Sequence, residues 1–364
     1  MKPEKNGKVS RKIEVKLTRP PPCTHVLTVD QLLANSRSSK IFKNYTGFSE
    51  DKFNLILQFL VPDKDRKHIR YYDPRSKSTQ MEMSLLFDEH VETELETQPV
   101  LGHREDHVLS VDNEFLMTLM KLRMGLSNFD LATRFGCSES TVSRILTTWI
   151  NYMYLRLGSL NIWPHRDIII AKMPPEFRHD YGTTMIIIDC LELKVQMPSS
   201  RQMQSKTYSN YKSTNTFKCL VGVDALGGII FVSQLYTGLI SDKEICHRSG
   251  FFKMLKLKLE CGDLLAGDGV MADKGFLIED DLAKLNLKLN IPPFLKQKPR
   301  FSELENIQTH TIAHHRIHVE RAICKVRRFD IFEKRIKIKS AGQMNQIWTV
   351  CCLLSNIQDW ILNV

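Results

Sequence analysis

The chain has 364 residues, which leaves room for about two domains plus tails. Its 42% hydrophobic content excludes wholesale disorder, and its formal charge of +10 suits a polyanionic partner such as nucleic acid. The nine cysteines are scattered without a C-x-x-C pair, which argues against a disulfide framework and against a cysteine zinc finger. The polar, basic start does not read as a signal peptide, and no apolar run reaches the roughly 18 residues of a membrane span.

The first third of the sequence carries few regular patterns. Residues 1–40 are basic, with prolines at 20–22 that break regular elements, and we expect a disordered basic tail there. Residues 41–107 predict a helical segment over Phe42 to Val61, followed by a charged linker.

The segment 108–160 predicts a helix-turn-helix DNA-binding module. Three helices are expected to end near Gly125, Phe135 and Tyr154. Gly136 can adopt the left-handed turn before the last helix, and Ser138 can cap that helix. Its outward face presents four candidate DNA contacts: Ser140, Thr141, Ser143 and Arg144. The alternative is an ordinary helical bundle, because the spacing of this motif is loose.

From residue 184 to 361 the periodicity changes to that of an α/β domain. Met185 to Ile188 is a continuous apolar run, typical of a strand buried on both faces, and strands are expected at Phe217–Val223 and Ile229–Val232. Further strands are expected over 264–272 and 288–291, and helices over 242–259, 278–285, 309–329 and 343–361. Strands that come first and then alternate with helices predict a mixed sheet flanked by helices.

Three acids in this region are candidates for a shared site. Asp189 and Asp273 each directly follow an apolar stretch that predicts a strand, and ligand sites of open sheets lie beyond strand ends. Glu320 lies beside the apolar stripe of a predicted helix, so its carboxylate can lean toward the sheet. From spacing alone, a turn or cap role remains the alternative for each acid.

Three converging carboxylates suit two hard divalent cations, Mg²⁺ or Mn²⁺, which can promote phosphodiester cleavage. Basic residues on the same predicted helix as Glu320 are candidate contacts to DNA phosphates: Arg316, Arg321, Lys325 and Arg328.

Several stretches between 108 and 361 together resemble Harbinger-type DDE transposases, including the domesticated genes derived from them. They are residues 208–218, 221–223, 238–245, 267–276, 290–295 and 316–322, in the family's order. The resemblance implies an RNase H-like core preceded by a helix-turn-helix, with a metal-dependent Asp189, Asp273 and Glu320 triad. Asp268 is an alternative to Asp273, although the Asp-Lys-Gly-Phe context favours Asp273. Asp242 also matches a family position, either supporting the site or contacting DNA.

The resemblance implies a divalent-metal-dependent DNA endonuclease, with strand transfer as a further step. The alternative is a catalytically silent domesticated transposase that acts in the nucleus as a DNA-binding or protein-recruiting factor. The expected location is the nucleus, with the cytoplasm as a second compartment. DNA is the expected partner; a separate DNA-binding protein and a second copy of this chain are further candidates, and a membrane is not. The spacing of His310, His314 and His318 could also hold a transition metal, but no further ligand is evident.

Overall fold

The computed structural model describes residues 26–34, 38–72, 109–295, 300–338 and 341–359. Most of the predicted tail and most of the predicted linker therefore lie outside the described residues. Within the predicted tail, α1 (Val29–Leu33) forms a short helix, with Thr28 as its N-cap. The disorder prediction for residues 1–40 is wrong for this stretch, because the capping box at Thr28 was not recognised in the sequence.

The predicted helix from Phe42 to Val61 is two helices, α2 (Ser38–Thr46) and α3 (Glu50–Leu60). The chain turns at Gly47, which has a positive φ, and restarts at Ser49, whose side chain accepts a hydrogen bond from the Lys52 amide. Two short 3-10 turns follow, η1 (Pro62–Lys64) and η2 (Arg66–His68).

The helix-turn-helix region is built from α5 (Val111–Met124), α6 (Asn128–Phe135) and α7 (Glu139–Gly158). A serine caps each start, at Ser110, Ser127 and Ser138, and left-handed Gly125 and Gly136 end the first two helices. At Gly136 a β-carbon would lie 2.9 Å from a Val26 methyl, so close packing also requires glycine there. These are the local signals on which the prediction rested.

Two short helices, α8 (Arg166–Lys172) and α9 (Pro175–Tyr181), lead into a mixed sheet. Its strands are β1 (Thr184–Lys194), β2 (Tyr208–Ser209), β3 (Thr214–Val223), β4 (Ile229–Val232), β5 (Tyr236–Thr237), β6 (Gly269–Met271) and β7 (Lys288–Asn290). The order is β2-β3-β1-β6-β7, with β4 and β5 also paired to β3. β3 runs antiparallel to β1, whereas β6 runs parallel to β1 and β7 parallel to β6.

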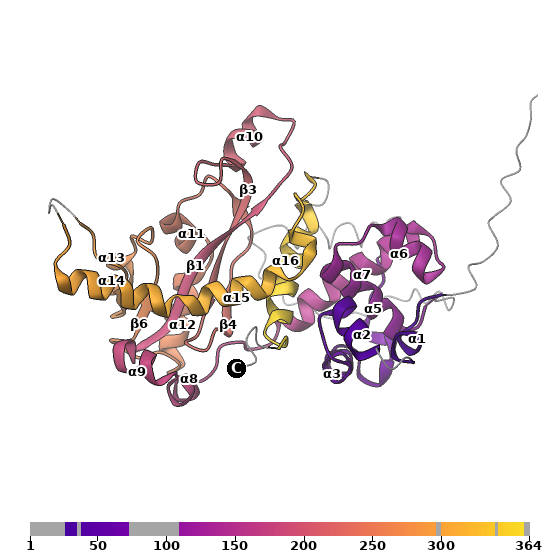
Figure 1. Ribbon diagram of the computed structural model, residues 1–364, viewed down its shortest axis with the longest axis horizontal. Helices are drawn as coiled ribbons and strands as arrows, with labels where there is room; N and C mark the ends of the chain where they lie inside the picture. The colour runs from indigo at the N-terminus through magenta and orange to yellow at the C-terminus, as the bar shows by residue number, and fades with distance from the viewer. Residues whose placement is uncertain (1–25, 35–37, 73–108, 296–299, 339–340, 360–364) are drawn as a thin grey trace, which may run out of the picture.

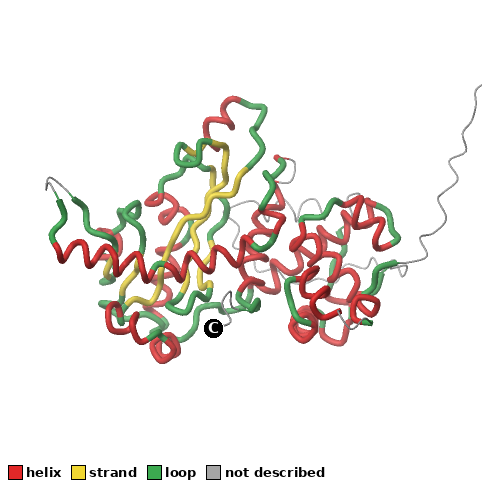
Figure 2. Tube along the Cα trace, viewed as in Figure 1, coloured by secondary structure: helices red, strands yellow, loops and turns green. Residues whose placement is uncertain are grey.

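Helices cover the sheet, as Figures 1 and 2 show. α14 (Glu303–His315) and α15 (Ile317–Arg327) form a nearly continuous rod across one face, where α15 packs on β1 and β3. α11 (Asp242–Arg248) packs on β3, and α12 (Phe251–Glu260) packs on β4 through a Phe231–Phe251 ring contact. α10 (Arg201–Thr207) and α13 (Glu279–Ala283) complete this part.

Four predicted elements of the sheet region are wrong in extent, and one of them is the last helix, predicted over 343–361, which ends at Ser355. The helix expected over 242–259 is broken at Gly250, which has φ +74°, and the one expected over 309–329 is broken at Arg316. The strand expected over 264–272 is only Gly269–Met271, because Gly267 adopts a positive φ and makes a turn before it.

The last helix, α16 (Ala341–Ser355), connects the two parts of the molecule. It packs on α7 of the helical part and on α15 and β4 of the sheet part, and it lies between them in Figure 1. The fold prediction, a mixed sheet flanked by helices after an all-helical module, is confirmed. No helix among the described residues has both the length and the apolar character needed to cross a membrane.

Candidate active site

The register of two parallel strands brings Asp189 and Asp273 to the same place. Ile187 of β1 is paired with Met271 of β6, and each aspartate lies two residues beyond its member of that pair. The prediction that Asp189 ends its strand is wrong, because β1 continues to Lys194 through its pairing with β3, whereas Asp273 does lie beyond the end of β6. Because neighbouring strands lie about 4.8 Å apart, the two residues lie side by side. Two residues separated by 84 positions in sequence are thus placed together by backbone pairing alone.

Each aspartate is held by the backbone amide that follows it and faces one shared cation. Cys190 N donates to Asp189 Oδ1 at 2.8 Å, and Lys274 N donates to Asp273 Oδ1 at 2.7 Å. The guanidinium of Arg316 lies 3.5 Å from Asp189 Oδ2 and 3.4 Å from Asp273 Oδ1. Asp189 is 23% exposed and Asp273 is 53% exposed, so both carboxylates remain open on one side.

Glu320 reaches the same neighbourhood from α15. It lies one helical turn after Arg316, and its amide donates to the Arg316 carbonyl at 3.3 Å. Burial raises the pKa of the Asp189 carboxyl and the nearby Arg316 guanidinium lowers it, while the charges of Asp273 and Glu320 raise it. Asp189 therefore lies within the electrostatic field of both other acids.

The side chain of Arg316 lies between the two aspartates. The sequence did not predict this position. It is 13% exposed, and its buried Nε has no hydrogen-bond partner among the described residues. We predicted it as a phosphate contact, but its charge is turned toward the two carboxylates. Its spacing of four residues from Glu320, which puts both on one helix face, is the sequence signal that could have indicated this.

The chemistry of these residues fits a hard divalent cation. All three candidates offer carboxylate oxygens, which Mg²⁺ and Mn²⁺ prefer, and a positive charge already stands against two of them. In this conformation, however, no three His, Cys, Asp or Glu side chains within the described ranges are grouped closely enough to hold a metal ion. The Arg316 guanidinium thus lies against the same aspartate oxygens that a bound metal ion would contact.

Asp268, the alternative to Asp273, lies at the opposite end of β6 and is saturated with donors. Its carboxylate accepts two hydrogen bonds from Arg166, at 2.9 and 2.8 Å, and one from the Leu265 amide at 2.8 Å. It is buried. These contacts give Asp268 a structural role, in which it fixes α8 against the start of β6.

Asp224 is an acid that the resemblance does not account for, and it closes a turn. It is buried, and Asp224 Oδ1 accepts from the amides of Leu226 and Gly228, at 2.9 and 2.8 Å. The sequence between β3 and β4 needs this Asx-type turn, so its acid is structural.

Asp242 lies against the loop that carries Asp273. Its carboxylate pairs with Lys218 Nζ at 2.7 Å, and a β-carbon at Gly275 would lie 2.5 Å from Asp242 Oδ2. It also interacts with the thiol of Cys190, next to Asp189, and the pKa of that thiol lies well above its usual value, first because of burial and then because of Asp242. Asp242 thus lies close to a residue next to Asp189 and to the loop that follows Asp273, and its role stays a prediction.

The predicted DNA contacts differ in their accessibility. Arg321 and Arg328 are exposed on or next to α15, and Ser140, Ser143 and Arg144 are exposed on α7. Thr141 is half-buried, with its hydroxyl 2.9 Å from that of the N-cap Ser138. Lys325 is buried, and burial lowers its pKa, so the prediction that it contacts DNA is wrong. It lies on the face of α15 turned toward the interior, which the charge of its side chain concealed.

The histidine alternative gains no support from the geometry. His314 lies 3.6 Å from Glu176, whereas the buried neighbour His315 is hydrogen-bonded to Asp180 at 2.8 Å. The helix is interrupted at Arg316, between His314 and His318. His318 packs edge-on against Phe177. These side chains have packing and pairing roles in the structure.

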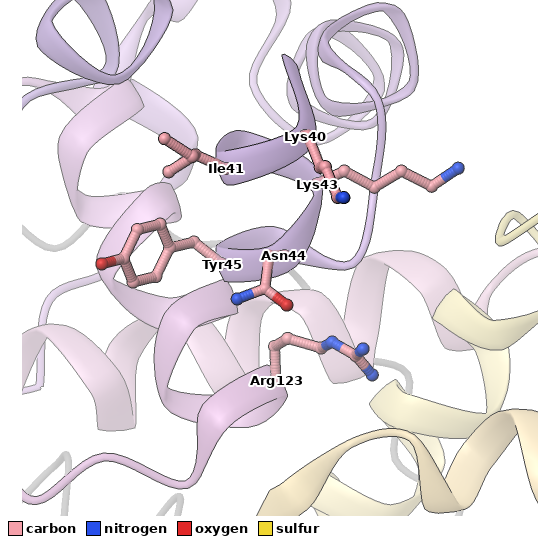
Figure 3. Close-up of a pocket in the computed structure, with 6 residues that line it drawn as sticks. All are labelled: Lys40, Ile41, Lys43, Asn44, Tyr45 and Arg123. Carbon is pink, nitrogen blue, oxygen red and sulfur yellow. The ribbon is translucent and has the colours of Figure 1, made fainter. Parts of the chain in front are cut away.

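A hollow of about 590 Å³ lies away from the carboxylates, on the helical part. Figure 3 shows five lining residues on α2 and a sixth, Arg123, reaching toward them from α5. Lys43 is already paired with Asp359, and Arg123 donates to the carbonyl of Arg328. The hollow therefore marks the seam between the helical part and the end of the chain.

The comparisons with known proteins agree with this division of the molecule. Residues 107–159 match the family model described as the helix-turn-helix of DDE superfamily endonuclease, and residues 188–356 match the model described as DDE superfamily endonuclease. The two matched segments cover more than half of the chain and contain both the predicted DNA-reading helix and all three candidate acids. The chain belongs to the DDE superfamily of endonucleases.

Three relatives of this DDE superfamily protein are the proteins named "Putative nuclease HARBI1" of Xenopus laevis, Rattus norvegicus and Homo sapiens. The first is 20% identical over 258 residues, the second 21% over 258 and the third 21% over 260. In each comparison the matched region covers 70% of this chain and 69% of the relative. The resemblance to Harbinger-type sequences is confirmed. No solved structure matches the chain.

Proposed function

We propose that this DDE superfamily protein is a divalent-metal-dependent DNA endonuclease with a transposase-like site made of Asp189, Asp273 and Glu320. One observation carries the proposal: the register of β1 and β6 brings Asp189 and Asp273 together, and the guanidinium of Arg316, one helical turn before Glu320, faces both of them. Clustered carboxylates that lack enough donors are unfavourable in a fold unless they have a function.

In this site the three carboxylates would hold Mg²⁺ or Mn²⁺, and bound divalent ions would supply activation of water and stabilisation of the leaving oxygen. The strands fix the spacing of Asp189 and Asp273, and α15 carries Glu320 one helical turn beyond Arg316, which faces both aspartates. Arg316 balances the charge of the aspartates, and Arg321 and Arg328 offer exposed guanidinium groups for DNA phosphates.

The helix-turn-helix would supply DNA recognition. Ser140, Ser143 and Arg144 lie exposed near the start of α7, the part of a recognition helix that contacts base edges. The strand order, with antiparallel β1 and β3 followed by parallel β6 and β7, supports an RNase H-like assignment of the sheet. A DNA substrate implies action in the nucleus.

A nicking assay on supercoiled plasmid tests the proposal. The wild type is expected to cut in Mg²⁺ or Mn²⁺ and to stop in chelator. Asp273→Asn is expected to cut at least about a hundredfold more slowly, as when one electrostatically critical group is removed from other enzymes. Asp280→Asn makes the same chemical change at an exposed acid on the neighbouring α13 and is expected to cut normally.

The outcomes separate the two functions considered for this chain. Equal rates in the wild type and Asp273→Asn would exclude the proposed site. A wild type that binds DNA but does not cut it in either metal would favour the catalytically silent DNA-binding factor.

A further inference from the structure

A projection extends from the sheet at the end of β3 far from the carboxylates. It consists of residues 201–213, that is α10, β2 and the loop into β3, and we call it the α10 projection. Figure 1 shows it reaching beyond the rest of the sheet at the top of the view. None of the candidate site residues lies on it.

The charge of this region has a single sign. No Asp or Glu occurs between Glu192 and Asp224. Four exposed cations lie on the projection or beside it: Lys194, Arg201, Lys206 and Lys212. None of these four forms an ion pair with another residue in the described part of the chain. A surface of this kind favours a polyanion.

Aromatic rings stand among these cations. The Tyr211 side chain is 84% exposed at the loop tip, and Tyr208 is 42% exposed on β2. Lys212 Nζ lies 4.3 Å from the centroid of the Tyr211 ring. Exposed rings next to cations match surfaces that bind single-stranded nucleic acid, where bases stack on the rings and cations contact the backbone.

The rings are carried on a firmly bonded base. Asn215 is buried and donates to the Gln204 carbonyl and to Thr207 Oγ1, both at 2.8 Å. The Lys212 amide donates to Ser209 Oγ at 3.2 Å and so closes the loop. At Gly238 a β-carbon would lie 2.2 Å from Thr216 Oγ1, which shows how tightly the supporting strand packs. The exposed rings are thus held in place by bonds beneath them.

β3 connects the projection to the candidate active site. Val221 is paired with Asp189, and Thr214 at the other end of the strand follows the loop directly. Seven residues of strand span about 23 Å, which is about seven base steps of DNA. DNA held at the carboxylates and running along the strand reaches the projection within one helical turn.

We infer that the α10 projection binds DNA flanking the cleavage site, with Tyr211 and Tyr208 stacking on unpaired bases and the surrounding cations contacting phosphates. This inference rests on the proposed function, because it places the cleaved strand at Asp189 and Asp273. The ligand class is DNA with frayed or single-stranded bases, as at a strand being separated for cutting.

Binding of DNA by the full-length chain with Asp273→Asn, which keeps the substrate intact, tests the inference without cutting. Fluorescence anisotropy would compare a labelled forked duplex with a blunt duplex of the same sequence. The further double change Tyr208→Leu with Tyr211→Leu is expected to weaken forked-DNA binding about five- to tenfold or more, and blunt-duplex binding much less. The matched control Tyr208→Phe with Tyr211→Phe keeps both rings and is expected to bind as before.

The role of the lysines on the α10 projection is tested separately, by the salt dependence of DNA binding. Lys206→Gln with Lys212→Gln is expected to lower the slope of log affinity against log salt by about 0.7 per lysine on a single strand. Equal weakening of forked and blunt DNA by the leucine changes, or no weakening of either, would overturn the inference. The binding experiment does not require cleavage. A failed nicking assay would therefore overturn the proposed function without deciding whether the α10 projection binds DNA.

Discussion

Two carboxylate sites in this molecule, one in the helical part and one in the sheet part, are built in opposite ways. Glu114 on α5 is buried, and its oxygens accept from Arg66 Nη1 at 3.0 Å, Tyr71 Oη at 2.6 Å and Trp149 Nε1 at 2.9 Å. Asp189 on β1 accepts one backbone amide and faces Arg316 at 3.5 Å, with two further acids nearby.

The difference separates a structural acid from a functional one. The three donors to Glu114 come from η2, from the stretch that follows it and from α7, and they leave few lone pairs available, so the acid ties these segments to α5. Asp189 keeps open lone pairs and a partly exposed side chain, and burial, with a smaller effect from its acidic neighbours, raises its pKa. Such a carboxylate contributes little to folding but is ready for a cation.

The largest effect on the free energy of unfolding is expected when an acid with a full set of hydrogen-bond donors is removed. Glu114→Ala leaves Arg66, Tyr71 and Trp149 without their shared acceptor, and breaking a buried pair of this kind costs about 3–5 kcal/mol. Urea unfolding followed by circular dichroism measures the loss. Glu139→Ala, at an exposed helix start in the same part, is expected to cost less than about 1 kcal/mol. Similar losses in both variants would show that the Glu114 contacts have no special weight.

Asp189, which has few donors, is expected to matter for activity and not for stability. Asp189→Asn removes a charge that burial, Asp273 and Glu320 disfavour, so the free energy of unfolding at neutral pH should stay constant or rise. Nicking should nevertheless fall by about a hundredfold to a thousandfold. Urea unfolding and the plasmid assay on the same preparation check both halves. A variant that unfolds as readily as Glu114→Ala would place Asp189 among the structural acids.

A smaller effect is expected at the cation between the aspartates. A guanidinium and a divalent ion compete for the same oxygens, so Arg316→Gln is expected to bind Mn²⁺ about three- to tenfold more tightly. Calorimetric titration of Mn²⁺ measures this independently of cutting, and Arg316→Lys, which retains the charge, is the control. Weaker Mn²⁺ binding by the glutamine variant would mean that Arg316 helps to assemble the cation site.

Local signals in the sequence predicted much of this architecture. Serine caps and glycine stops predicted the helix-turn-helix, and the apolar runs before Asp189 and Asp273 predicted the two strands whose register brings these residues together. The break at Arg316 could not be predicted, because the helical pattern continues across it without a glycine or proline. The burial of Lys325 was hidden for a related reason, since only the packing of α15 against other elements determines it.

Contacts between residues far apart in the sequence were the hardest to predict. The donors to Glu114 come from positions 66, 71 and 149, and no spacing in the sequence connects them. The apolar runs located the two strands, but the adjacency of the aspartates depends on which strands pair, and β1 pairs with β6 across a long stretch of chain. The sequence therefore indicated the three acids as candidates and Arg316 as a basic residue, but it did not indicate that Arg316 lies between two of the acids.

The smallest effect is expected at Asp359, an acid that is saturated like Glu114 but 41% exposed, so it tests whether burial or saturation sets the strength of such a contact. Hydrogen bonds from Lys43 and then Lys52 lower its pKa to about 2, from an ordinary value of 3.8. Because the folded pKa is depressed, the stabilisation is present above about pH 4 and is lost as the pH falls through about 2.

Asp359→Asn should cost less than about 1 kcal/mol at pH 7, because solvent screens the exposed ion pairs. Urea midpoints of both proteins between pH 7 and pH 2 should therefore converge at the acid end, and added salt should shrink the difference at pH 7. A cost near that of Glu114→Ala would show that saturation with donors is sufficient without burial.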